Sequence, residues 1–305
     1  MRSGIVGWLL AAGLALAPPV SAALRLLATT TDLAALASVV GGDLVEVESI
    51  MPAGVDPEGF EPRPRDFDRL RRTDVLVRVG LGYDYWLDAL LNRNGDLRFM
   101  RGGNAYVDAS TGIPLLEVRG QGVVSEGGHA HGVANPHYWL DPHNAAIVTA
   151  GIAEALIRLA PAQRERFLAN RERFLDQLKT RQAQWAQTLA PFAGARLIAY
   201  HNSWPYFARR FRLDIVDYIE PKSGVGPSPS HLAKLIAHGR KANVRAVLHE
   251  PYQPEDASRF VAQKLDIPLL RFALSVGSVP AATDYLALLD HNVTVLAGAL
   301  TLGKH

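Results

Sequence analysis

The sequence predicts an α/β protein of two lobes, each with a central, mostly parallel sheet flanked by helices, joined by a long connecting helix. Short apolar runs alternate with helical patterns in the first part of the chain. The alternation stops after Pro142, where residues 143–190 are helical in pattern throughout, and it returns afterwards. Strand alternating with helix is typical of a parallel sheet covered on both faces.

The first lobe is predicted over residues 23–142. Asp32 can cap the first of its helices. Its strands are expected at Leu24–Ala28, Leu44–Ile50 and Val75–Val79, and its helices at Asp32–Val40, Pro64–Arg71 and Tyr83–Leu91.

The connecting helix is predicted over residues 143–190. Ala153, Leu156 and Ala160 recur at helical spacing. Pro161 can open a second segment, because proline is favoured at the first position of a helix. A bend is therefore expected near Pro161.

The second lobe is predicted over residues 191–305. Its strands are expected at Arg196–Tyr200, Leu213–Tyr218, Val244–His249 and Ile267–Arg271, and its helices at Ser203–Arg210, Pro229–Lys241, Pro254–Leu265 and Ala281–Ala297.

The chain begins with features of a secretory signal peptide. Arg2 precedes an apolar stretch over residues 4–17, and small residues surround Ala22, after which cleavage is expected. The stretch is shorter than the ~20 residues of a membrane span, and no later segment is expected to be apolar over that length. The chain has no cysteine, which excludes disulfides and a lipid-anchored cysteine. We expect a soluble periplasmic monomer after residues 1–22 are removed.

The number and distribution of the charged residues do not indicate a nucleic-acid-binding protein. The formal net charge is +2, and basic and acidic residues are interspersed without a basic stripe.

Four polar side chains lie at strand ends or in neighbouring loops. In parallel sheets, ligands gather beyond the carboxyl ends of the strands. Glu58 and His137 belong to the first lobe, and His201 and Glu250 to the second. Two imidazoles and two carboxylates converging on one cleft would bind a divalent metal ion.

Each of these residues also has a structural interpretation. His137 could cap the following helix, His201 could be a core histidine, Glu250 could cap the helix near Pro254, and Glu58 could be a solvated loop charge. Asp141 is expected to start the connecting helix rather than to bind metal. The prolines of NPHYWLDPHN, residues 135–144, would limit the conformations of the turn that presents His137.

The chain resembles the zinc- and manganese-binding proteins of bacterial ABC importers, the group called cluster 9 or cluster A-I. The resemblance covers nearly the whole chain after residue 22, and its segments are VDPEGFEPRPRD, ANPHYWLDPHNA, LIAYHNSWPYFARRF, YIEPKSGVGPSPSHL and VLHEPYQPEDASRFVAQKL. It implies two α/β lobes, a rigid connecting helix and one metal ion between the lobes.

The resemblance also implies ligands by position. His137 and His201 match two ligands of the family. The first family ligand is usually a histidine, but here the turn reads Asp56-Pro57-Glu58. The last is often an aspartate of a late turn, but residues 274–277 carry no carboxylate, so Glu250 is the expected replacement, with Asp284 in reserve. Relatives often have a longer histidine-rich loop where this chain has His129 and His131, which could collect metal or belong to an ordinary surface loop.

The expected function is capture of zinc, or alternatively manganese, for delivery to an inner-membrane ABC permease. The altered turns leave a second hypothesis, a receptor or metallochaperone with a drifted site that binds a metal–chelate complex or another small ligand. A metal-dependent hydrolase is a third hypothesis, although the chain has neither an HExxH pair nor a GxSxG motif.

Overall fold

The first lobe is built on a four-stranded parallel sheet in the order β2-β1-β3-β4. The computed structural model describes residues 23–56, 59–118 and 133–302. Three strands confirm the predicted positions, whereas β4 was not predicted. The strands are β1 (Leu24–Ala28), β2 (Val45–Ser49), β3 (Val75–Arg78) and β4 (Tyr106–Asp108).

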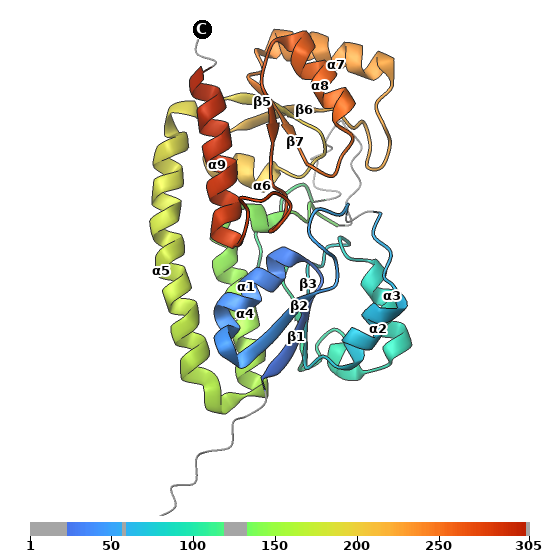
Figure 1. Ribbon diagram of the computed structural model, residues 1–305, viewed down its shortest axis with the longest axis vertical. Coiled ribbons are helices and arrows are strands. Elements are labelled where there is room, and N and C mark those ends of the chain that lie inside the picture. Colours follow the sequence, from blue (N-terminus) through green and yellow to red (C-terminus); the bar gives the residue numbers. More distant parts are fainter. Residues whose placement is uncertain (1–22, 57–58, 119–132, 303–305) are drawn as a thin grey trace, which may run out of the picture.

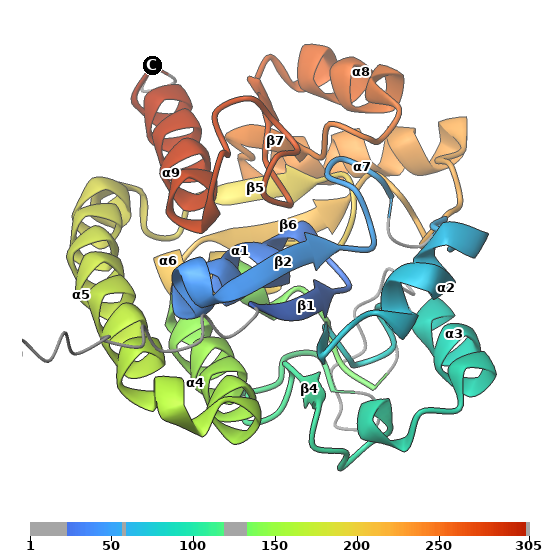
Figure 2. The same ribbon diagram turned by 60° about the horizontal axis from the view of Figure 1, so that its bottom comes forward.

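Helices cover both faces of this sheet (Figures 1 and 2). One face carries α1 (Thr31–Gly41) and α4 (Pro142–Leu159), which pack on each other, and the other carries α2 (Pro64–Arg71) and α3 (Trp86–Asn94). The expected cap of α1 was wrong. Thr30 caps this helix by accepting from the backbone of Leu33, because the Asp32 side chain turns to the second lobe instead.

The predicted connecting segment 143–190 comprises two helices rather than one bent helix. After α4, the chain reverses at Ala160, where Pro161–Gln163 form a 3₁₀ turn, and continues as α5 (Arg164–Leu189). In Figure 1, α5 runs back alongside the first lobe and reaches the level of β5 in the second lobe. The long connecting helix is therefore α5, while α4 belongs by packing to the first lobe.

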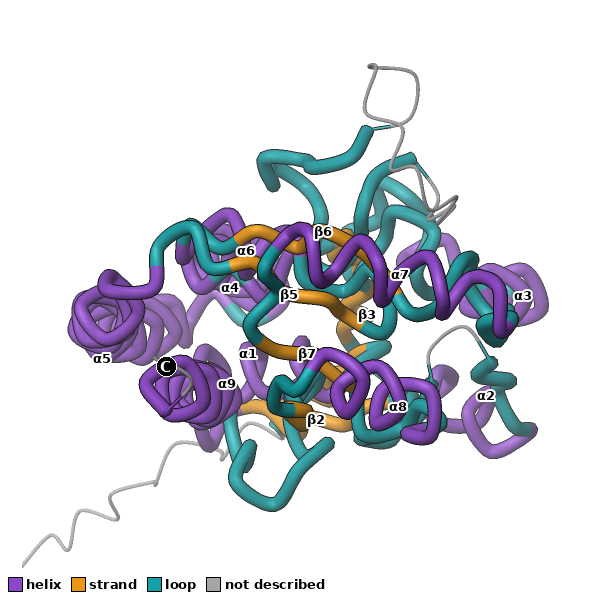
Figure 3. Tube along the Cα trace, turned by 90° about the horizontal axis from the view of Figure 1, so that it is seen from above, coloured by secondary structure: helices purple, strands orange, loops and turns teal. Residues whose placement is uncertain are grey.

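The second lobe repeats the architecture with a parallel sheet in the order β6-β5-β7-β8. Viewed from above, α7 and α8 cover one side, and α9 lies beside α5 (Figure 3). The elements are β5 (Arg196–Ala199), α6 (Pro205–Phe211), β6 (Asp214–Tyr218), α7 (Pro229–Ala242), β7 (Ala246–His249), α8 (Glu255–Leu265), β8 (Leu269–Arg271) and α9 (Tyr285–Leu302).

One apolar core extends through both lobes. It contains Leu26 of the first sheet, Trp139 of the turn before α4, Phe174 of α5 and Leu248 of the second sheet. Two smaller clusters lie elsewhere, one containing Leu87 of α3 and one containing Leu235 of α7. Because a continuous core resists shear, the lobes are joined rigidly on this side.

The expectation that no later segment is apolar over a membrane-spanning length was wrong for α9. Among the described residues, Tyr285–Leu302 is long and apolar enough to cross a membrane by length and composition. In the structure this helix packs against α5 and buries Leu288, Leu289 and Leu296 in the core. Its apolar composition therefore serves the interior of the second lobe.

Candidate metal centre

The turn over residues 135–144 is anchored to both lobes. The Tyr138 hydroxyl donates to the Val79 carbonyl at 2.9 Å, and the Trp139 indole donates to the Leu274 carbonyl at 3.0 Å. Asp141 caps α4 by accepting from the backbone N–H of His143, as predicted. This turn therefore has a fixed place between a strand end of each lobe.

His137 is almost completely buried in this turn. Its Nδ1 lies 3.2 Å from Asn135 Oδ1, which also accepts from the His137 backbone N–H at 3.1 Å. An amide oxygen only accepts, so Nδ1 is the donor, and in the neutral imidazole Nε2 carries the lone pair. Tyr83 and Trp139 pack against the ring, with centroids at 5.5 and 5.4 Å. The ring is thus oriented by packing as well as by hydrogen bonding.

His201 follows β5 at the carboxyl edge of the second sheet. Its Nδ1 lies 2.5 Å from Glu220 Oε2, and both side chains are 5 % exposed. Because a carboxylate accepts, Nδ1 is again the donor, and in the neutral imidazole Nε2 carries the lone pair. A carboxylate behind a histidine is the usual partner of a metal-binding imidazole.

The two imidazoles come from different lobes and lie together. Their centroids are 5.8 Å apart, at an angle of 69°. For two imidazoles on one tetrahedral zinc ion, with Zn–N of about 2.0–2.1 Å, the centroids would be separated by about 5 Å. The observed spacing therefore suits a shared ion after a small adjustment.

Glu250 directly follows β7, and its carboxylate is near enough to His201 to interact with it electrostatically. It is fully buried, and its Oε1 accepts from the Trp204 indole at 2.7 Å, while Oε2 has no hydrogen-bond partner at accepted geometry among the described residues. Burial raises the pKa of Glu250, and the neighbouring His201, Ser203 and Trp204 oppose that shift. It does not cap the following helix, because α8 begins at Glu255 with Pro254 as its N-cap.

The remaining predicted residues are not placed at the histidines. Glu58, His129 and His131 lie outside the described residues, as does the predicted signal peptide. Asp284 is exposed and caps α9 by accepting from the Ala287 N–H at 2.9 Å. Within the described part of the chain, no group of three or more histidine, aspartate and glutamate side chains is close enough to hold a metal ion. The structure therefore brings together two of the four predicted ligands.

Two supporting residues were missed from the sequence. Glu220 follows β6 at the same sheet edge as His201, so the strand-end rule that found His201 could have found it. Asn135 stands two positions before His137, and nothing in the sequence alone indicates the direction of its side chain.

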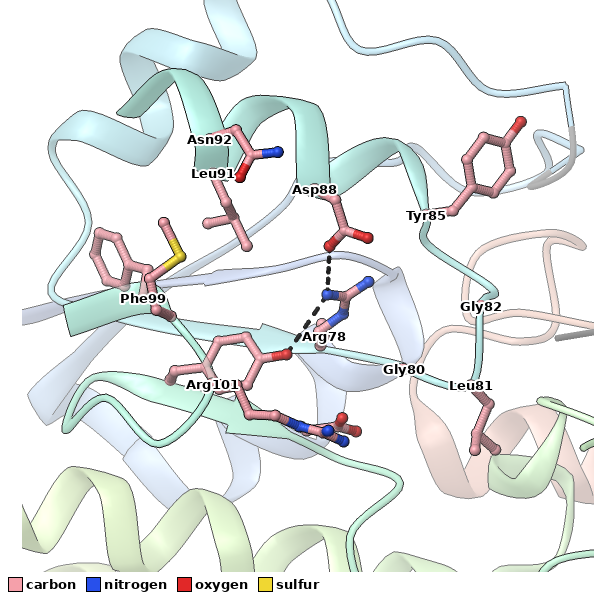
Figure 4. Close-up of a pocket in the computed structure, with 13 residues that line it drawn as sticks. Arg78, Gly80, Leu81, Gly82, Tyr85, Asp88, Leu91, Asn92, Phe99 and Arg101 are labelled. Atoms are coloured by element: carbon pink, nitrogen blue, oxygen red, sulfur yellow. Dashed lines mark hydrogen bonds and ion pairs between the residues drawn. The ribbon is translucent and has the colours of Figure 1, made fainter. Parts of the chain in front are cut away.

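A separate hollow of about 500 Å³ lies in the first lobe (Figure 4). Arg78 crosses it and pairs with Asp84 and Asp88 at 3.0 and 2.7 Å. Asp84 also accepts from the N–H groups of Val79 and Gly80 at 2.7 and 3.2 Å. These bonds fix the turn that carries Tyr83 against His137.

Comparisons with known proteins agree with this architecture. A family model described as zinc-uptake complex component A, periplasmic, matches residues 26–299. The manganese ABC transporter substrate-binding lipoprotein PsaA of Streptococcus pneumoniae is 23% identical over 286 residues, covering 91% of this chain and 89% of that protein. The manganese-binding lipoprotein MntA of Halalkalibacterium halodurans is 25% identical over 268 residues, covering 86% and 83%.

Zinc-binding proteins are among the similar proteins too. The zinc-binding protein AdcA of Streptococcus pyogenes is 22% identical over 270 residues, covering 85% of this chain and 52% of AdcA. A crystal structure of a ZnuA deletion mutant with zinc bound superimposes with a TM-score of 0.77 at 27% identity, covering 91% of this chain and 98% of that one. The chain therefore belongs to the zinc-uptake complex component A family, whose members are metal-binding proteins of ABC transporters and not enzymes.

Proposed function

We propose that the protein captures a divalent metal ion, zinc in preference to manganese, between its two lobes and delivers it to an ABC permease. The observation that carries the proposal is the pair of buried imidazoles, His137 and His201, which come from opposite lobes and lie with their centroids 5.8 Å apart, each with an acceptor at Nδ1. Ligands drawn from two lobes couple metal binding to lobe position.

The remaining ligands are proposed as Glu58 and Glu250. The unpartnered buried oxygen of Glu250, close to His201, supports its inclusion. Because its other oxygen is bound by Trp204, binding an ion would require the Glu250 side chain to shift. Two imidazoles suit zinc, and each added carboxylate makes the site more acceptable to manganese.

The partner and location follow from the family. A permease of the cytoplasmic membrane would receive the ion. A binding protein located on the outer side of that membrane could deliver the ion to the permease. Four expectations stay predictions. They are cleavage after Ala22, the monomeric state, the division into lobes at residues 142 and 190, and metal collection by His129 and His131.

Calorimetric titration of chelator-stripped protein with Zn²⁺ and with Mn²⁺ tests the proposal. We expect one-to-one binding, tighter for Zn²⁺, that weakens at least about 100-fold in His201→Ala and less in Glu58→Ala. His238→Ala is the matched control, because His238 is exposed and pairs with Asp217 on the outer side of the second lobe.

A second candidate is a receptor for a metal–chelate complex, or a metallochaperone. It is favoured by the late turn at residues 274–277, which carries no carboxylate and whose Val276 N–H is bound by Asp32. If neither bare ion binds the folded protein better than about 1 mM, which corresponds to about 4 kcal/mol, the bare-ion receptor fails and this candidate replaces it.

A further inference from the structure

Glu117 joins the two segments that carry the histidines. Its Oε2 accepts from Asn135 Nδ2 at 3.0 Å and from Asn202 Nδ2 at 2.8 Å. Asn135 stands two residues before His137, and Asn202 directly follows His201. One carboxylate oxygen therefore links the first-lobe and second-lobe sides of the candidate metal centre.

The two asparagines depend on this acceptor because both are buried, at 1 % and 0 % exposure. Asn135 Nδ2 has one other acceptor, the Asn202 carbonyl at 2.9 Å. Its Oδ1 is thereby turned toward His137, where it receives the backbone N–H and the ring Nδ1–H. A flipped Asn135 would present N–H groups to Nδ1 instead, which would move the ring proton to Nε2.

Hydrogen bonds of the preceding residue hold the backbone at Glu117 in place. Glu117 has a φ of +52°, a left-handed conformation that non-glycine residues adopt only rarely. The preceding Leu116 donates its N–H to the Tyr206 hydroxyl at 3.1 Å and accepts from the Asn135 N–H at 3.0 Å. Tyr206 in turn donates to the Asn135 carbonyl at 3.2 Å. The carboxylate is thus presented by a backbone fixed to both of the segments that it joins.

We propose that Glu117 is a positioning residue for the metal centre, which holds the His137 and His201 segments at a fixed separation and keeps the His137 proton on Nδ1. The proposal rests on the metal-binding function proposed above. Glu117 acts by accepting hydrogen bonds from Asn135 and Asn202. Its effect therefore depends on the length of its side chain and on an acceptor oxygen rather than on negative charge.

Three substitutions separate reach from charge. Glu117→Gln keeps an oxygen that can accept from both asparagines. Glu117→Asp keeps the negative charge but shortens the side chain by one methylene group. Glu117→Ala removes both the charge and the hydrogen-bond acceptor. Glu154→Ala, on the exposed face of α4, is the control. Circular dichroism and thermal unfolding establish that each variant is folded.

Zn²⁺ affinity, measured by competition with a chromophoric chelator, is the first readout. We expect Glu117→Ala and Glu117→Asp to bind about 10-fold more weakly, and Glu117→Gln and Glu154→Ala to stay within about 3-fold of the unsubstituted protein. Unchanged affinity in Glu117→Ala would overturn the proposal. A loss in Glu117→Gln as large as in Glu117→Ala would overturn it too, because charge would then be responsible.

The histidine tautomers of the metal-free protein are the second readout, taken from long-range ¹H–¹⁵N spectra of the rings. We expect the His137 proton on Nδ1 in the unsubstituted protein and partly on Nε2 in Glu117→Ala. An identical tautomer in both would refute the positioning role. If the unsubstituted protein binds no zinc, the proposed function fails, whereas this readout still decides the role of Glu117.

Discussion

The Asp32 carboxylate accepts a hydrogen bond from the backbone N–H of Val276 at 2.9 Å, joining the first turn of α1 to a loop of the second lobe 244 positions later. Thr31 adds a second bond by donating its hydroxyl to the Val276 carbonyl at 2.8 Å. Two neighbouring residues of the first lobe thus bind both backbone polar groups of one residue, Val276, in the other lobe.

Asp32 is expected to make stability depend on pH. Burial raises its pKa from 3.8 to about 7. The folded state therefore retains a proton that the unfolded state has lost, so stability falls as pH rises from 3.8 to about 7, by up to about 1.4 kcal/mol per pH unit. Asp32→Asn, which keeps an oxygen for Val276, should remove this slope.

Urea unfolding at pH 5, 6, 7 and 8 measures the effect as the difference between the two proteins. Other titrating groups contribute equally to both and cancel. Parallel stability curves for Asp32→Asn and the unsubstituted protein would show that Asp32 has an ordinary pKa.

Glu220→Gln tests the partner of His201. The amide can still accept from Nδ1–H, but the negative charge that strengthens Nε2 as a donor to metal is lost. We expect Zn²⁺ affinity to fall about 10-fold. Asp217→Asn is the control, because Asp217 pairs with the exposed His238 at 2.9 Å. Equal affinities in competition titrations of both variants would exclude Glu220 as a support of the site.

Glu250→Gln tests the proposed fourth ligand. If the unpartnered oxygen of Glu250 binds the ion, replacing it with an amide nitrogen weakens Zn²⁺ binding, by about 10-fold or more. The bond from Trp204 can persist to the remaining oxygen. If calorimetry finds that Glu250→Gln binds Zn²⁺ with unchanged affinity, and the variant is more stable than the unsubstituted protein at pH 7, Glu250 is not a ligand. Its role would then be to accept the hydrogen bond from Trp204.

Arg210→Ala tests the start of α4. Arg210 donates two hydrogen bonds to the buried Asp141 carboxylate, at 2.6 and 3.0 Å. Their loss should lower the free energy of unfolding by about 1–3 kcal/mol. Arg166→Ala breaks an exposed pair with Asp43 and should cost less than about 1 kcal/mol. Urea unfolding compares the two, and a similar cost for both would contradict the importance of burial at Asp141.

Much of the fold could be predicted from the sequence because its signals are local. Apolar runs predicted seven of the strands to within a few residues. Pro64 and Pro229 were predicted as the first residues of two helices, and α2 and α7 begin at these residues in the structure. Asp141 was predicted as a cap for the same reason, since a cap acts on its own helix. The strand-end rule and the family motifs led to His137 and His201.

Other features depend on contacts between residues far apart in the chain, which no local pattern contains. The three-residue strand β4 is defined by its pairing with β3. Asp32 does not cap α1, because its carboxylate accepts from the backbone N–H of Val276. Asn135 and Glu117 reach the candidate metal centre only through the directions of their side chains. The sequence by itself determined the elements and the two histidines, because periodicity and turn chemistry are local. Only the tertiary structure decided how those histidines are oriented, since the positions of the Asn135 and Glu220 side chains in the fold determine which ring nitrogen donates.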